Sequence, residues 1–130
     1  MSQRKENNNI NKVVALLSVL DKDKRYYAEA YSFVMAALGF TTKKLSRKGH
    51  VTGGELLEGI KEYALNEFGP MARAVLEHWG IKKTDDFGEI VFNMIDAGML
   101  GKTDNDSKKD FADRFDFKDA FDKGCRYSIQ

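Results

Sequence analysis

The sequence predicts a mainly helical domain, a compact bundle of about five helices that could end in a β-hairpin, in a winged-helix-like arrangement. Its apolar residues recur, in several segments, at the three- and four-residue spacing of one helix face. Glycines stand where several of these segments end, and Thr52-Gly53-Gly54-Glu55 has the form of a helix-starting capping box. A chain of 130 residues is long enough for one ordinary core.

The chain divides into three parts. Residues 1–11 are polar, rich in asparagine and without a periodic apolar face, so we expect a disordered lead. Residues 12–123 form the single helical domain, and residues 124–130 are a tail. We find no internal repeat and no second domain.

Two helices are expected in the first third of the domain. Residues 12–20, capped by Asn11, form the first, with an apolar face of Val13, Leu16, Leu17 and Leu20. Residues 26–38 form the second, which ends at Gly39 and has an apolar face of Tyr27, Ala30, Tyr31, Val34 and Leu38. The basic segment 40–50 lacks a helical stripe, so it is predicted to be a loop, with a short strand as an option.

Three further helices follow. The capping box at Thr52 starts a helix over 53–68, which ends at Gly69-Pro70, where proline suits the first turn of the next helix. That next helix covers 70–79. Thr84 is expected to cap the last one, 84–97, which has two aspartates in its first turn and stops at Gly98.

The C-terminal part changes pattern. Phe115 and Phe117 alternate with a charged residue, as in a strand, so residues 99–103 and 113–117 are predicted to pair as a hairpin around a polar tip. One or two helical turns over 116–123 would close the domain.

Composition favours a globular protein of a reducing compartment. The sequence is 42% hydrophobic, with a net charge of +1 and a single cysteine, Cys125, so it has no internal disulfide. The apolar run 13–20 is too short to span a bilayer and no cleavage site follows it, so we expect neither a signal peptide nor a membrane anchor, and a cytoplasmic location.

Charge is uneven along the chain. Residues 1–52 carry ten Lys/Arg and four Asp/Glu, whereas residues 84–130 carry seven and eleven. Such blocks can steer a charged partner, but they more commonly complement each other within a fold.

Three motifs, ELLEGIKEYALNEFGPMAR, WGIKKTDDFGEIVF and DFADRFDF, lie within residues 49–117. Together with YYAEAYSFVMAALGFTT at residues 26–42, they resemble an uncharacterised bacterial family of small single-domain proteins that is known only by a locus-style name. The resemblance covers nearly the whole chain after the first two dozen residues, and it implies no activity, cofactor or catalytic residue. The long asparagine-rich lead departs from the usual form of that family.

No motif predicts catalytic, cofactor-binding or metal-binding residues. His50, His78 and Cys125 are the only soft metal ligands, and their spacing fits no zinc site. His78 is expected to be a partly buried packing residue or a partner of a helix dipole. The aspartates at 104, 106, 110 and 113 fail the EF-hand pattern, so a solvated hairpin tip is the better interpretation. The glycines near residue 53 lack the Lys-Ser/Thr of a phosphate-binding loop.

The basic segment is the one candidate binding site, for phosphate or another partner. Its residues are Lys43, Lys44, Arg47, Lys48 and His50. A run this short is more often a solvated loop. The aromatic residues at 26, 27, 31 and 33 could stack on bases but are better explained as core. The helix over 84–97 has four acidic residues and no Lys or Arg, so sequence-specific DNA binding through it is not expected.

Three functions therefore remain open. The first is a non-enzymatic adaptor that binds a protein or ribonucleoprotein partner, because no catalytic constellation is present. The second is a nucleic-acid binder, with RNA as the target, that uses residues 43–50. The third is an enzyme with a polar site assembled from residues such as Glu58, Glu62, Tyr63 or His78. The oligomeric state cannot be read from the sequence.

Overall fold

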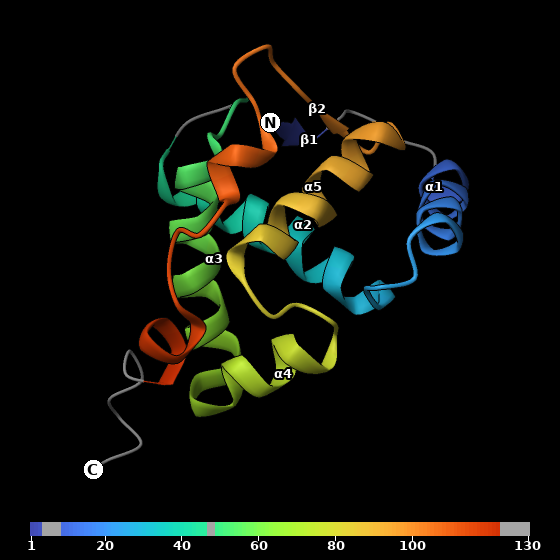
Figure 1. The fold of residues 1–130 in the computed structure, drawn as a ribbon. Helices are drawn as coiled ribbons and strands as arrows, with labels where there is room; N and C mark the ends of the chain where they lie inside the picture. Colours follow the sequence, from blue (N-terminus) through green and yellow to red (C-terminus); the bar gives the residue numbers. More distant parts are fainter. Residues whose placement is uncertain (4–8, 47–48, 123–130) are drawn as a thin grey trace.

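The computed structural model of the chain describes residues 1–3, 9–46 and 49–122, and they form the mainly helical domain that the sequence predicts. Within these residues the fold has five α-helices, three short helical turns and one pair of short strands, arranged as in Figure 1. In chain order the elements are β1 (Ser2–Gln3), α1 (Asn9–Lys22), α2 (Ala28–Lys44), α3 (Gly53–Phe68), η1 (Gly69–Met71), α4 (Ala72–His78), α5 (Thr84–Asp96), β2 (Leu100–Gly101), η2 (Lys108–Phe111) and η3 (Lys118–Asp122).

The core lies where α2, α3 and α5 meet. In Figure 1, α5 crosses in front of α2, α3 lies on one side of them and α4 lies below. Each helix contributes a buried apolar face, as the spacing in the sequence predicts. The largest of these buried side chains are Tyr31, Leu38, Leu56, Leu57, Ile60, Leu76, Phe87 and Ile90.

The capping box at the start of α3 is confirmed. The backbone N–H of Glu55 donates to the Thr52 hydroxyl over 3.1 Å, and the backbone N–H of Thr52 donates to the Glu55 carboxylate over 2.9 Å. At the other end of α3, Gly69 adopts a positive φ of 53°, and a 3-10 turn with Pro70 leads into α4. These local signals were sufficient to locate both ends of the helix.

Helix α2 does not stop at Gly39, as predicted, but continues to Lys44. Thr41 lies on the buried side of the added turn and packs closely against Gly59 of α3. The hydroxyls of Thr41 and Thr42 donate to carbonyls one turn earlier, those of Ala37 and Leu38. Packing against α3 therefore outweighs the roughly 1 kcal/mol by which glycine disfavours a helix interior.

The predicted apolar face of α1 is correct for Leu16 and Leu20 and wrong for Val13 and Leu17. The helix buries Val19, with Leu16 and Leu20 partly buried beside it, whereas Val13 and Leu17 are exposed. It covers Asn9–Lys22, so Asn11 lies inside the helix and is not its cap. A similar error affects α2, whose predicted core residue Tyr27 is 52% exposed while its neighbour Tyr26 is buried.

The predicted hairpin does not form among the described residues. Strand β2 pairs antiparallel with β1, with Ser2 opposite Gly101 and Gln3 opposite Leu100, and residues 113–117 contain no strand. The reason is Phe111, which is fully buried where Gly53 of α3 and Gly88 of α5 leave room for its ring. This contact fixes η2 on the two helices and directs the following residues away from β2.

The lead is also not disordered where it is described. Met1 is fully buried, β1 pairs with β2, and α1 already begins at Asn9. This order comes from contacts with residues 50–51 and 100–106, which no local pattern in the lead could reveal. Residues 4–8 and the predicted tail at 124–130, which includes Cys125, lie outside the described residues.

The start of α5 differs slightly from the prediction, and the closing turn is present. Thr84 is the first residue of α5 and not its cap; its hydroxyl donates to the Phe111 carbonyl and accepts from the Arg114 N–H. The Asp86 carboxylate instead accepts from the backbone N–H groups of Lys82 and Lys83. The expected closing turn is present as η3, a π-helical turn with Phe121 buried.

Candidate functional site

The predicted basic segment is divided between a helix, a loop and a polar cluster. Lys43 and Lys44 form the last turn of α2, where Lys43 is exposed and Lys44 makes an ion pair with Glu62 of α3. Arg47 and Lys48 lie outside the described residues. His50 is turned toward Met1 and Asp106. The grouping in the sequence is therefore only partly kept in space, and phosphate binding by these residues stays a prediction.

His50 belongs to a cluster that joins three distant parts of the chain. The Met1 ammonium group lies 2.6 Å from His50 Nδ1, and it donates to the Val51 carbonyl over 2.9 Å and to Asp106 Oδ2 over 3.0 Å. The Thr103 N–H donates to the same carboxylate. Asp106 is therefore not part of a solvated tip, as the sequence suggested, but a buried acceptor.

The environment of Asp106 shifts its ionisation. Burial acts to raise the pKa of this carboxyl group, but hydrogen bonds from the Thr103 N–H and the Met1 ammonium group, with further help from His50, outweigh burial and lower the pKa. Burial lowers the pKa of the Met1 ammonium group, against the attraction of Asp106. These groups satisfy one another, so the cluster is a structural junction.

A second polar cluster connects the end of α1 to α5. The Asp23 carboxylate accepts from Arg25 over 2.7 Å and from the Asn93 amide over 2.9 Å, and Asn93 also donates to the Tyr31 hydroxyl. Arg25 in turn donates to Glu89. The hydrogen bond from Arg25, assisted by Asn93 against the effect of burial, places the pKa of Asp23 well below its usual range. Each charge here has a partner, as in a structural network.

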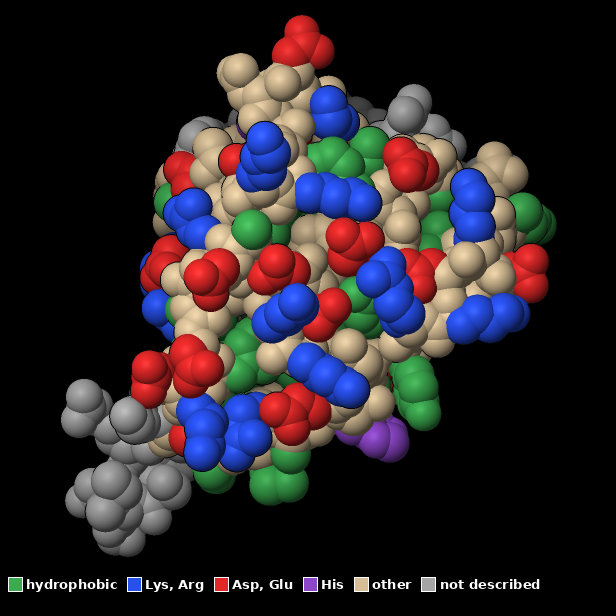
Figure 2. Space-filling model, viewed as in Figure 1, with side chains coloured by type: hydrophobic (Ala, Val, Ile, Leu, Met, Phe, Trp, Pro, Cys, Tyr) green, Lys and Arg blue, Asp and Glu red, His purple; other side chains and the backbone are tan. Residues whose placement is uncertain are grey.

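The charge blocks of the sequence are mixed on the folded surface. Figure 2 shows acidic and basic side chains interspersed on the face that carries α5. Arg25 from the basic part pairs with Glu89 from the acidic part, and Arg73 in the middle pairs with Asp122. This face therefore has no broad area of one sign that could steer a nucleic acid.

Four aliphatic side chains on α1 form the most prominent exposed apolar feature. Ile10, Val13, Val14 and Leu17 are 72%, 56%, 58% and 60% exposed, and their spacing places them on one side of the helix. In Figure 1, α1 lies at the edge of the molecule, beside the bundle. We call these four side chains the α1 stripe. Singly exposed aliphatic residues are normal, but a row of four on one helix face is a candidate interaction surface.

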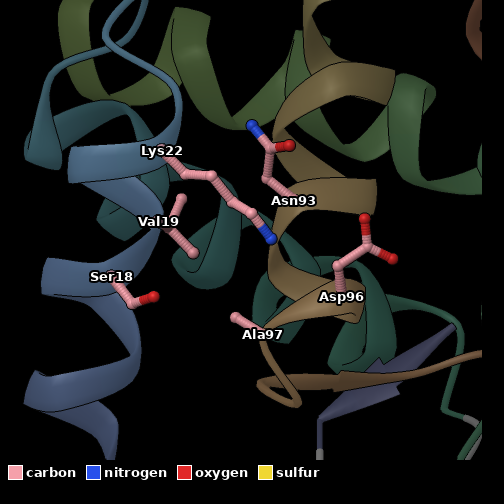
Figure 3. A pocket seen from close by; sticks show the side chains of 6 residues that line it. All are labelled: Ser18, Val19, Lys22, Asn93, Asp96 and Ala97. Carbon is pink, nitrogen blue, oxygen red and sulfur yellow. The ribbon is translucent and has the colours of Figure 1, made fainter.

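A small pocket separates α1 from α5. Ser18, Val19, Lys22, Asn93, Asp96 and Ala97 line its volume of about 90 Å³. Figure 3 shows the Lys22 side chain reaching from α1 toward α5, into the space beside Asn93 and Asp96. The pocket has room for a few waters at most.

Two larger cavities border α3. One, of about 460 Å³, lies between the end of α2 and the first half of α3, and its lining includes Glu55, Glu58, Glu62 and Lys44 as well as Leu45 and two glycines. The other, of about 290 Å³, is lined by Glu29, Ser32, Phe33, Tyr63, Glu67, Phe68 and Trp79. The four residues suggested for an enzyme site are thus not brought together: Glu58 and Glu62 line one cavity and Tyr63 the other.

His78, the fourth of these residues, lines neither cavity. It is exposed in the last turn of α4 and packs edge-to-face on Tyr27, with ring centroids 5.4 Å apart. The prediction that His78 is partly buried is therefore wrong, whereas its place at a helix C-terminus agrees with a dipole partner. No three His, Cys, Asp or Glu side chains of the described residues are grouped as a metal site.

Comparison with protein families, with curated proteins and with solved structures found no match. The resemblance to a bacterial family therefore stays a prediction. Within residues 1–3, 9–46 and 49–122, no helix has both the length and the apolar character needed to cross a membrane.

Proposed function

We propose that this protein is an interaction module without catalytic activity, and that α1 inserts into an apolar groove of a protein partner. The observation that supports this proposal is the α1 stripe, whose four side chains are each more than half exposed. Residues spaced i, i+3, i+4 and i+7 are the anchors by which an amphipathic helix occupies a hydrophobic groove.

The chemistry of the stripe argues for a protein surface. Among residues 10–20 of α1 the only charged side chain is that of Lys12, so this part of the helix has little with which to bind phosphate. An aliphatic partner surface would remove the four side chains from water, which is the favourable term in most protein association.

The size of the stripe argues for a groove rather than for a second copy of the chain. A stable interface takes about 800 Å² from each partner, contributed by 20 to 30 residues. Two convex helices that meet along four side chains supply only a fraction of this area. A groove also encloses the flanks of the helix. Helix α1 is accessible to such a groove because Val19 is the only buried side chain among its described residues.

A photo-crosslinking residue at position 13 should capture the partner in cells, whereas the same residue at Lys108, on the far side of α5, should not. The captured protein is then purified and its affinity measured directly. Val13→Gln/Leu17→Gln should weaken binding at least thirtyfold, as for loss of central anchors. A peptide of residues 9–22 should compete. Unchanged affinity of the double variant would contradict the proposal.

The matched control is Ser18→Gln/Lys22→Gln, which alters the same helix outside the stripe and should retain most of the affinity. Both double variants should melt like the parent, because Val13 and Leu17 are already exposed. Sedimentation at high protein concentration should find a monomer. A dimer that the Val13→Gln/Leu17→Gln variant abolishes would instead identify the partner as a second copy.

A further inference from the structure

The cavity of about 290 Å³ at the junction of α2, α3 and α4 is an open depression of the surface, and it has an aromatic wall. Phe33 comes from α2, Tyr63 and Phe68 from α3, and Trp79 directly follows α4. The Phe33 ring lies 5.5 Å from that of Tyr63, 5.8 Å from that of Phe68 and 5.9 Å from that of Trp79, between ring centroids. Three separate segments of the chain therefore build one aromatic surface.

This surface is held in place but not closed. Phe33 is only 6% exposed and supports the other three rings from the core side. Tyr63, Phe68 and Trp79 are only partly buried, so parts of these rings remain in contact with solvent. The Phe68 and Trp79 rings meet edge-to-face, at an angle of 79°. The faces of aromatic rings carry negative potential and attract cations.

Two acidic residues border the same cavity. Glu29 of α2 and Glu67 of α3 are both exposed lining residues. No ion pair joins either carboxylate to a Lys, Arg or His of residues 1–3, 9–46 or 49–122, whereas Glu62, Glu77 and Glu89 all have such a partner. The cavity thus combines aromatic rings with two carboxylates that form no ion pair with a described residue.

We propose that this cavity binds a small organic monocation, an ammonium group that carries methyl groups or a short aliphatic chain. The aromatic faces suit the methyl groups and the diffuse positive charge, and the two carboxylates suit the charge alone. A purely apolar ligand would gain nothing from Glu29 and Glu67, and a phosphate-bearing ligand would be repelled by them. The volume of about 290 Å³ lies just below the usual range for ligand pockets, so the ligand is small.

The tryptophan in the wall makes binding directly measurable. Trp79 is the only tryptophan of the chain, so tryptophan fluorescence reports on the surroundings of this one lining residue. Choline serves as the probe, and its neutral carbon analogue, with a tert-butyl group in place of the trimethylammonium group, has the same shape. Choline should change the emission with a saturable, millimolar dissociation constant, and the analogue should bind at least tenfold more weakly.

Variants separate the role of charge from that of shape. Glu29→Gln/Glu67→Gln should weaken choline binding about tenfold and leave the affinity for the analogue unchanged. Glu58→Gln/Asp104→Asn removes the same two charges from exposed positions elsewhere and should leave choline binding intact. Phe68→Leu keeps an apolar side chain but removes a ring, and it should weaken choline binding more than binding of the analogue.

Equal affinities for choline and its analogue would overturn the proposal, as would choline binding that survives the Glu29→Gln/Glu67→Gln change. The Gln variants alter only exposed positions, so they should fold like the parent even if Phe68→Leu does not. This test does not involve the α1 stripe, so the monocation site and the protein-binding proposal can fail separately.

Discussion

The Thr52 hydroxyl stabilises the start of α3 by accepting a hydrogen bond from the Glu55 N–H. The Glu55 carboxylate in turn accepts a hydrogen bond from the Thr52 N–H. Thr52→Ala should lower the free energy of unfolding by about 1 kcal/mol, because the Glu55 N–H loses its acceptor. Denaturant melts measure this change. Thr52→Ser keeps the hydroxyl and should recover most of the loss, so equal losses in the two variants would show that capping is not the cause.

At the scale of single residues, the sequence predicted interactions between near neighbours and missed those between distant ones. Thr52 and Glu55 are three positions apart, so their pairing is visible in the sequence. His50 and Asp106 are far apart in sequence but lie 3.1 Å apart in the fold, and no local pattern indicates that contact. For the same reason the polar tip was expected to be solvated, although it contains a buried carboxylate.

At the scale of elements, helices were found wherever the apolar periodicity was strong, but the buried face was not always the predicted one. Helix α1 has apolar residues on several sides, so the sequence alone allows Leu16 to be grouped either with Val13 and Leu17 or with Val19. The fold buries the one that ends in Val19 and leaves Val13 and Leu17 exposed. Two of the four side chains of the α1 stripe, Val13 and Leu17, were therefore assigned to the core by the periodicity, and only the structure shows that they are exposed.

The crossing of α2 and α3 gives a prediction at this scale. A Cβ added to Gly59 would lie 1.7 Å from the Thr41 hydroxyl oxygen and 2.8 Å from its Cβ, far inside van der Waals contact. Gly59→Ala should therefore force the two helices apart and destabilise the protein by about 2 kcal/mol, despite the better helix propensity of alanine. Thermal and denaturant melts report this loss.

Gly54 in the same helix provides the matched control. Its nearest contact would be the end of the Arg114 side chain, at 3.3 Å, which can move aside. Gly54→Ala should therefore be neutral or stabilise the protein by up to about 1 kcal/mol. If the two substitutions had the same effect, the close approach of α2 and α3 at Gly59 would be disproved.

At the scale of the whole molecule, the chain is joined by contacts between its ends and its middle. Strand β1 pairs with β2 near residue 100, and Phe111 fills the space between α3 and α5. Neither contact follows from local periodicity, because each depends on segments that are far apart in sequence. The fold class could therefore be predicted, whereas the partner of the C-terminal strand and the order of the lead could not.

The Asp106 cluster makes this long-range joining sensitive to pH. Although burial acts to raise its pKa, the Thr103 N–H, the Met1 ammonium group and His50 leave the pKa of Asp106 lower in the folded protein than in the unfolded chain, where it is about 3.9. Its contribution to stability is therefore fully present above that unfolded value. It is lost as pH falls further, through the lower pKa of the folded state.

Asp106→Asn should remove this contribution and part of the acid dependence together. At neutral pH the variant should be less stable by about 3 kcal/mol, because the buried Met1 ammonium group loses its carboxylate. The difference from the parent should shrink steadily below about pH 4, where the parent's carboxylate also becomes neutral. The lowered pKa of Asp23 should leave the variant with some remaining acid sensitivity.

Asp104→Asn, at an exposed position in the same loop, is the control, and its stability should follow that of the parent at every pH. Denaturant melts between about pH 7 and about pH 3 measure the free energy of unfolding of the parent and of both variants. The stability difference between Asp106→Asn and the parent can change with pH only if an ionisation differs between the folded and unfolded states. A difference that stays constant over this range would therefore disprove the linkage.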